Sequence, residues 1–169
     1  LHLLAFALCW ANIWNPDDEN SQKKVRSMFQ EMVQWGVEEG VDLIIGETFY
    51  YAGEAYAALE EIKKSNLPAV LTISPMGVNI MRDGISMVDT CKELEQRGGD
   101  VVGMNCFRGP TTMMTYLKEI RKAIKCHMAA LPIPFRTTKE QPTFFNLDDN
   151  NNCTCPSPHG RTFPTALDP

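Results

Sequence analysis

Residues 98–110 read GGDVVGMNCFRGP, and this stretch constrains the fold more than any other. A short, largely apolar run, 101–105, follows two glycines and an aspartate and leads directly to a thiol. Such a run, with a helical pattern after it, is typical of a buried parallel strand whose carboxyl end opens into a loop. Parallel α/β sheets place their chemistry at that end. Cys106 is therefore a candidate metal ligand or nucleophile, or else a small buried core residue.

The same strand-then-helix unit repeats on both sides of this stretch. Apolar residues three and four positions apart predict a helix over 21–38, which Gly40 ends. Short apolar runs predict strands at 3–8, 41–45, 69–73, 101–105 and 127–131, each about one βα unit from the next. The alternation predicts a parallel sheet with helical crossovers. No G-x-G-x-x-G turn is present, but the pattern alone leaves a doubly wound sheet and a (β/α)8 barrel both open.

The composition excludes some classes of partner. The chain has 169 residues and a net charge of -5, which does not favour a nucleic-acid partner. It has no apolar stretch long enough to span a bilayer, so we expect no membrane partner. Its six cysteines show no disulfide-framework spacing, which favours reduced thiols and a cytoplasmic location. The chain begins without Met and ends at Asp168-Pro169, so we expect a piece of a longer protein.

Glu47 follows the predicted strand 41–45, at the same sheet edge as Cys106. A carboxylate there could hold a substrate ammonium, ligate a metal or act as a base, or it could be an acid at a helix N-terminus. The aromatic residues at 49–51 could surround a cationic ligand, but we expect them simply to pack, as such residues do over a barrel rim. Glu54 is expected to be a solvated helix charge.

Three further features are weaker candidates. Arg108 could lower the pKa of the Cys106 thiol, bind an anion or lie on the surface. His127 starts a strand and so lies at the wrong end of the sheet for catalysis, which favours a structural role. Cys153 and Cys155, with His159 nearby, lie in an Asn-, Pro- and Ser-rich loop, and Cys-x-Cys is not a usual zinc spacing.

Four stretches resemble the homocysteine S-methyltransferase family, and the nearest branch is the betaine–homocysteine methyltransferases and their relatives. The stretches are GVDLIIGETFYYAGEA (40–55), LPAVLTI (67–73), GGDVVGMNCFRGP (98–110) and ALPIPFRTTKEQPTF (130–144). The resemblance runs to about Phe145 and resumes at 163–169. It implies that residues 1–169 are one partial domain of an incomplete (β/α)8 TIM barrel, about strands 3 to 7, with an irregular loop at about 146–162.

The resemblance also implies a chemistry, which is zinc-dependent transfer of a methyl group to the thiol of homocysteine to give methionine. Cys106 matches one zinc ligand, and the family's other two ligands, an adjacent Cys-Cys pair, are absent from this sequence. Glu47 matches the glutamate that contacts the substrate amino group, and Thr48 and Asn105 are taken with it as substrate-binding. No catalytic residue is expected beyond the metal site. The expected partners are homocysteine and a methyl donor such as betaine or S-methylmethionine, and an oligomer is left open.

Position 48 weakens the case for betaine. The betaine branch tends to have a tyrosine there, and an aromatic face is what binds a quaternary ammonium. Because two zinc ligands are missing, we expect the fragment itself to be inactive. Two alternatives stay open, namely a non-catalytic barrel remnant or binding module, and an acyl-transfer enzyme with Cys106 as nucleophile. The acyl-transfer alternative needs a histidine at the same sheet edge, and the pattern places none there.

Overall fold

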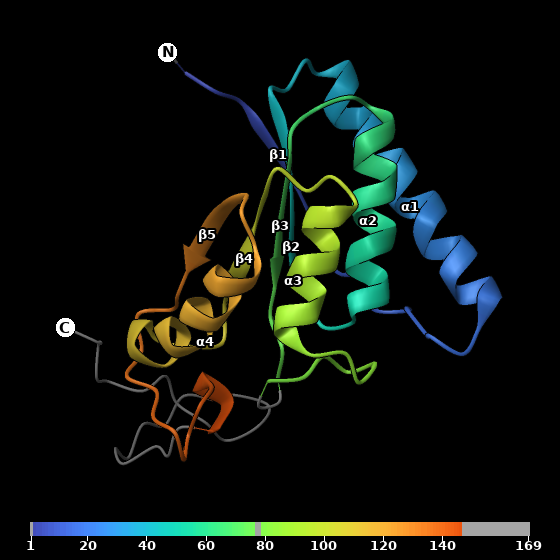
Figure 1. Ribbon diagram of the computed structural model, residues 1–169. Coiled ribbons are helices and arrows are strands. Elements are labelled where there is room, and N and C mark those ends of the chain that lie inside the picture. The colour runs from blue at the N-terminus through green and yellow to red at the C-terminus, as the bar shows by residue number, and fades with distance from the viewer. Residues whose placement is uncertain (1, 77–78, 147–169) are drawn as a thin grey trace, which may run out of the picture.

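The structure is a computed structural model that describes residues 2–76 and 79–146. Strands and helices alternate along the described chain, as the sequence predicts (Figure 1). In order they are β1 (Ala5–Cys9), α1 (Glu19–Glu38), β2 (Leu43–Phe49), α2 (Ala52–Lys64), β3 (Ala69–Ile73), α3 (Met87–Gln96), β4 (Val101–Asn105), α4 (Pro110–Ala123), β5 (His127–Leu131) and a 3-10 turn η1 (Phe144–Asn146).

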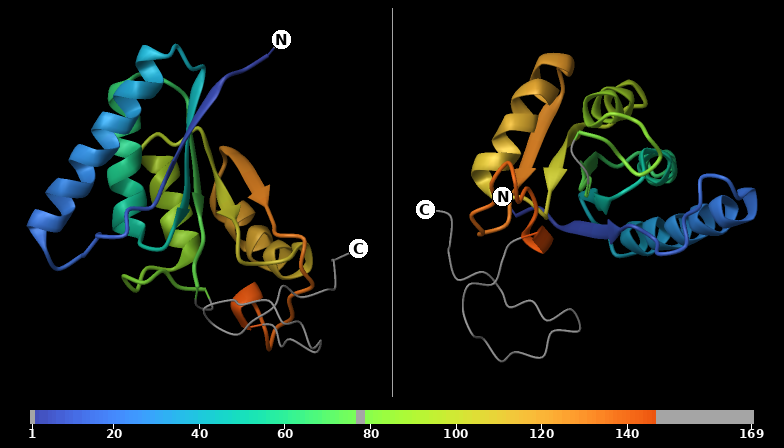
Figure 2. Two further views of the ribbon diagram at one scale, coloured as in Figure 1. Left: turned by 180° about the vertical axis from the view of Figure 1, so that it is seen from behind. Right: turned by 90° about the horizontal axis from the view of Figure 1, so that it is seen from below.

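The five strands form one parallel sheet in the order β1-β2-β3-β4-β5. Because parallel crossovers are right-handed, a strand order that never reverses places every helix on the same face of the sheet. Figures 1 and 2 show the helices along one face. A doubly wound sheet would instead reverse its strand order and carry helices on both faces. The structure thus has an α/β fold with a five-stranded parallel sheet. That this sheet is part of a (β/α)8 barrel, and the numbering of its strands within that barrel, stay predictions.

Local sequence explains where the helices begin. The Asp18 side chain accepts a hydrogen bond from the Asn20 amide at the start of α1, and Pro110 occupies the first turn of α4. Ser86 caps the start of α3, since its hydroxyl accepts a hydrogen bond of 3.0 Å from the Asp89 amide. These caps fix the loops that follow the strands.

The hydrophobic core lies between the sheet and its helices. Alternate strand residues point toward the helices, and the helices contribute residues one turn apart. Among the fully buried members are Phe29, Ile44, Leu59, Ile62, Leu71, Leu94, Val102 and Ile120. The opposite strand residues, such as those of the exposed face of β1, point away from this core.

Gly103 is required where β4 meets β5. A Cβ atom there would lie 1.9 Å from the carbonyl oxygen of Ala129, the residue it pairs with. No side chain fits at that distance, so a glycine is needed for the two backbones to approach. In the part of the chain that the structure describes, no helix is long and apolar enough to cross a membrane.

Candidate functional site

β2 carries one extra residue near its end. Gly46 pairs with Leu71 and Phe49 pairs with Ile73, so three steps along β2 correspond to two along β3. Within this bulge Thr48 has a φ of 64°, the left-handed region that a β-branched residue rarely adopts. The bulge turns the side chains of residues 47 and 48 relative to a regular strand. The sequence prediction ended this strand at residue 45, whereas the structure continues it to Phe49.

The Asn105 side chain connects β4 to this bulge across the end of β3. Its Oδ1 accepts a hydrogen bond of 3.0 Å from the Thr48 amide, and its Nδ2 donates 2.7 Å to the Thr48 hydroxyl. Nδ2 also lies 3.5 Å from a Glu47 carboxylate oxygen. The Ser74 hydroxyl at the end of β3 donates to Asn105 as well. Asn105 is buried, and its amide holds the bulge in place by paired hydrogen bonds.

Cys106 lies at the same carboxyl edge, directly after β4. Cys106 and Phe107 both have positive φ, 59° and 53°, and the Cys106 amide donates to the Leu131 carbonyl at 3.0 Å. The prediction that Glu47 and Cys106 share one edge is therefore confirmed. We call Glu47, Thr48, Asn105 and Cys106 the strand-end cluster. Strained backbone at Thr48 and Cys106 is of the kind that clusters at functional sites.

The Cys106 thiol is not activated by its surroundings. Burial raises its pKa, a hydrogen bond with the Phe107 backbone opposes this, and the charge of Glu47 raises it further. Arg108 is not a surface residue. It is buried, with a guanidinium nitrogen 2.8 Å from the Pro75 carbonyl and the group over the Tyr116 ring. His127 begins β5, at the opposite end of the sheet from Cys106, as predicted. This geometry gives no support to the acyl-transfer alternative.

Cys9 is a neighbour of the cluster that the sequence analysis missed. It ends β1, pairs with Glu47 in register and is exposed. Partial desolvation of the sulfur raises the pKa of the thiol, hydrogen bonds with the Trp10 backbone and the Thr48 side chain oppose the rise, and the charges of Glu47 and Glu54 add to it. Its position at the end of an apolar strand is the same signal that identified Cys106. Cys9, Cys91, Cys106 and Cys126 are all free thiols.

Aromatic rings cover this edge of the sheet. The Tyr50 ring lies 4.6 Å from Trp10 and 5.6 Å from Phe107, with which it stacks. Phe107 in turn contacts Phe144 and Phe145 of η1. Phe49 and Tyr50 are buried, so the prediction that these aromatics pack is confirmed for both.

Glu54 corrects a prediction. Instead of being solvated, it is fully buried, and its Oε1 accepts a hydrogen bond of 2.5 Å from the Ala11 amide beyond β1. Desolvation raises its pKa to about 7, although the hydrogen bond from Ala11 opposes the rise. A signal for this burial was available in α2, where alanines at 52, 55, 57 and 58 indicate a helix packed closely around that turn.

The donor set of a zinc site is incomplete among the described residues. No group of three or more His, Cys, Asp or Glu side chains in 2–76 and 79–146 could hold a metal ion. Cys106 brings one thiolate, whereas protein zinc sites use three or four ligands. Cys153, Cys155, His159 and most of the predicted irregular loop lie outside the described residues.

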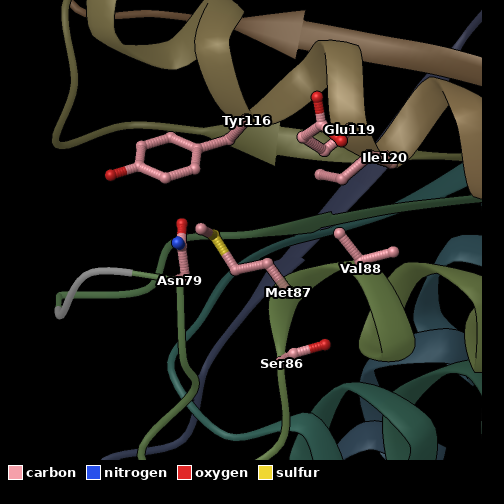
Figure 3. Close-up of a pocket in the computed structure, with 7 residues that line it drawn as sticks. All are labelled: Asn79, Ser86, Met87, Val88, Tyr116, Glu119 and Ile120. Carbon is pink, nitrogen blue, oxygen red and sulfur yellow. The ribbon is translucent and has the colours of Figure 1, made fainter.

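A separate cavity lies between α3 and α4, away from the strand-end cluster. It has a volume of about 250 Å³ and is largely apolar (Figure 3). Its lining residues are Asn79, Ser86, Met87, Val88, Tyr116, Glu119 and Ile120. None of these lining residues belongs to the strand-end cluster, so this cavity is not the candidate site.

The fold and the cluster define a class of protein, a parallel α/β domain with a polar site at the carboxyl ends of its strands. The family model for "Homocysteine S-methyltransferase" matches residues 5–149, and the chain belongs to that family. The family resemblance seen in the sequence is therefore confirmed.

Individual relatives agree with this assignment. The chain is 29% identical to betaine–homocysteine S-methyltransferase 1 of Xenopus laevis over 124 residues, covering 69% of this chain and 30% of that protein. It is 28% identical to S-methylmethionine–homocysteine S-methyltransferase BHMT2 of Pongo abelii over 142 residues, covering 80% and 38%. The chain thus spans between 30% and 38% of the length of these two relatives.

A solved structure supports the fold. The homocysteine methyltransferase MmuM of Escherichia coli, in its apo form, superposes with a TM-score of 0.55 over 75% of this chain and 56% of that one. The two sequences are 14% identical, so this likeness concerns the fold alone.

Proposed function

We propose that the strand-end cluster binds homocysteine and that the protein transfers a methyl group to its thiol. The observation that carries the proposal is the amide of Asn105, which fixes the Glu47–Thr48 bulge at the same edge as Cys106. Glu47 is partly exposed there, so its carboxylate can accept hydrogen bonds from a substrate ammonium. Family membership supports the identity of the substrate.

The reaction balances with a positively charged methyl donor. The homocysteine thiol loses its proton to solvent, its sulfur forms a bond to the methyl carbon, and the bond from that carbon to the donor's nitrogen or sulfur breaks. Both electrons of the broken bond stay with the donor, which leaves as a neutral amine or thioether at that atom. In this scheme Glu47, Thr48 and Asn105 orient the substrate, so that its sulfur faces the donor.

Zinc does not fit the described residues as a complete site. Cys106 could supply one thiolate, and a bound zinc ion would stabilise the substrate thiolate. The remaining ligands would have to come from outside the described residues, so no step is derived through the metal. We propose that the 169-residue chain alone forms no methionine.

Methionine formation from homocysteine tests the activity. The assay uses betaine and S-methylmethionine as separate donors, with the intact protein and with the 169-residue chain. We expect turnover by the intact protein with at least one donor and none by the chain alone. Cys106→Ala in the intact protein should abolish turnover, while Glu31→Gln on the exposed surface of α1 should not change it. A Cys106→Ala protein that keeps its rate would refute a role for this thiol in methyl transfer.

One observation favours the second candidate, a non-catalytic binding module. In the described part of the chain, Cys106 is the one cysteine that matches a zinc ligand of the family, and no group of three or more His, Cys, Asp or Glu side chains there could hold a metal ion. The three residues taken as substrate-binding, Glu47, Thr48 and Asn105, are all present at the sheet edge. Homocysteine binding by an intact protein that shows no turnover with either donor would support it.

A further inference from the structure

The first turn of α2 is connected to two separate loops. The Asp83 carboxylate accepts hydrogen bonds from the amides of Ala52 at 3.1 Å and Gly53 at 2.9 Å. Asp83 therefore caps α2 from the β3–α3 loop. The next residue, Glu54, turns away from its own helix and accepts the hydrogen bond from Ala11. The side chain of Glu54 thus joins α2 to the backbone that follows β1, 43 residues earlier.

The surroundings of Glu54 are unusual for an acid. Its side chain is 0% exposed, and its second oxygen, Oε2, has no hydrogen-bond partner among the described residues. The ion pairs found there include none with Glu54. The charge of Glu54 acts on the thiol of Cys9 on β1 and on the phenol of Tyr50 before α2. The Asp83 carboxylate caps the same turn of α2, and the Arg82 guanidinium lies over the Tyr50 ring, but neither group contributes to the raised pKa of Glu54. Buried acids are usually paired with a cation or fully hydrogen-bonded, so a buried glutamate with one unpartnered oxygen suggests a functional role.

The hydrogen bond from Ala11 fixes residues that touch the strand-end cluster. Ala11 comes directly after Cys9 and Trp10. Cys9 makes a hydrogen bond with the Thr48 side chain, and the Trp10 ring packs 4.6 Å from that of Tyr50. A shift of Ala11 would therefore move one polar and one aromatic neighbour of the site together.

We propose that Glu54 is a positioning residue of the strand-end cluster, which holds Cys9 and Trp10 in place through Ala11, and that its proton controls ligand binding there. Glu54 touches no substrate in this scheme and acts only through the backbone. An ionised carboxylate accepts a stronger hydrogen bond than a neutral one, so the loop after β1 should be held more firmly as pH rises. The ligand is homocysteine, and this part of the inference rests on the proposed function.

The amide of Ala11 gives a direct test that needs no ligand. Proton–nitrogen spectra of the protein are recorded from about pH 5 to about pH 9, a range that spans the value to which burial raises the pKa. We expect the Ala11 amide shift to titrate near neutral pH and to stop titrating in Glu54→Gln. Glu61→Gln is the matched control, because Glu61 is also buried on α2, two turns further on. An Ala11 amide that does not titrate in the wild type, or that still titrates in Glu54→Gln, would overturn the proposal.

Calorimetric titration with homocysteine tests the effect on the site. The wild type should bind about fivefold more tightly at the high end of that pH range than at the low end, and Glu54→Gln should lose most of this dependence. Glu54→Gln keeps an oxygen that can accept from Ala11, so it should fold. Equal pH dependence of binding in the two proteins would overturn the proposed control of binding. A wild type that binds no homocysteine would instead refute the proposed function. The Ala11 amide titration would then still test whether the proton of Glu54 affects the backbone at Ala11.

Discussion

At the scale of single residues, the candidate site is defined by polar side chains that hydrogen bonds to the buried Asn105 hold in place. Asn105 is buried and donates to or accepts from three neighbouring groups, Glu47, Thr48 and Ser74. Its hydrogen bonds hold Thr48 in a backbone conformation that the residue would otherwise avoid. Removing one partner of such a buried set leaves the others unsatisfied, which is more costly than losing a surface contact.

Glu54 gives a pH-dependence of stability with a definite sign. Burial raises its pKa from 4.5 to about 7, so the folded state holds the proton more tightly than the unfolded state. The stabilisation from this proton is fully present below about pH 4.5 and is lost as pH rises through about 7. Relative to Glu54→Gln, the free energy of unfolding of the wild type should fall by about 3 kcal/mol across that window. Urea unfolding of both proteins at a series of pH values measures it, and parallel pH curves would contradict it.

At the scale of elements, the contact between β4 and β5 depends on one glycine. Gly103→Ala should force the two strands apart and lower the free energy of unfolding by at least about 2 kcal/mol, because its Cβ would meet the Ala129 backbone. The control is Gly40→Ala, where φ is 70°, in the left-handed region, but no atom lies within 4 Å of the added Cβ. Gly40→Ala should cost only about 1 kcal/mol. Equal losses for the two variants in urea unfolding would contradict the steric account.

The elements themselves were largely predictable from the sequence. β3, β4 and β5 have the predicted bounds because each is a short apolar run between clear turn signals. β2 was placed too early and too short, since the bulge at Thr48 depends on Asn105 from a strand 57 residues away. For Cys9 and Glu54 the sequence held a partial signal, the end of an apolar strand for Cys9 and the alanines of α2 for Glu54. Their partners, Thr48 and Ala11, come from distant segments, and local periodicity does not report such contacts.

At the scale of the whole molecule, the described sheet is open. β1 and β5 are its outer strands, and Leu131 at the end of β5 is 50% exposed. The cluster and the aromatic rings lie together at the carboxyl end of this sheet, on the last residues of the strands and on the segments that follow them. Such separation of scaffold and site is general in parallel α/β folds.

Metal content is the prediction that concerns the whole chain. After dialysis the purified 169-residue chain should retain well under one equivalent of zinc, because one family thiolate cannot complete a tetrahedral site. Elemental analysis of the wild type, Cys106→Ser and Cys153→Ser measures this content. One full equivalent that disappears in Cys106→Ser would refute the prediction. A full equivalent lost only in Cys153→Ser would instead identify Cys153 as a metal ligand.

The most direct test of the central claim is the affinity of the protein for L-homocysteine with and without the Glu47 carboxylate. Calorimetric titration compares the wild type, Glu47→Gln and the surface control Glu31→Gln, each with homocysteine and with 4-mercaptobutyrate, which lacks the amino group. Glu47→Gln should weaken homocysteine binding by about 1.5–3 kcal/mol, roughly 10- to 150-fold, and should leave binding of the amine-free analogue unchanged. Equal dissociation constants for homocysteine in the wild type and Glu47→Gln would contradict the assignment of the strand-end cluster as the substrate site.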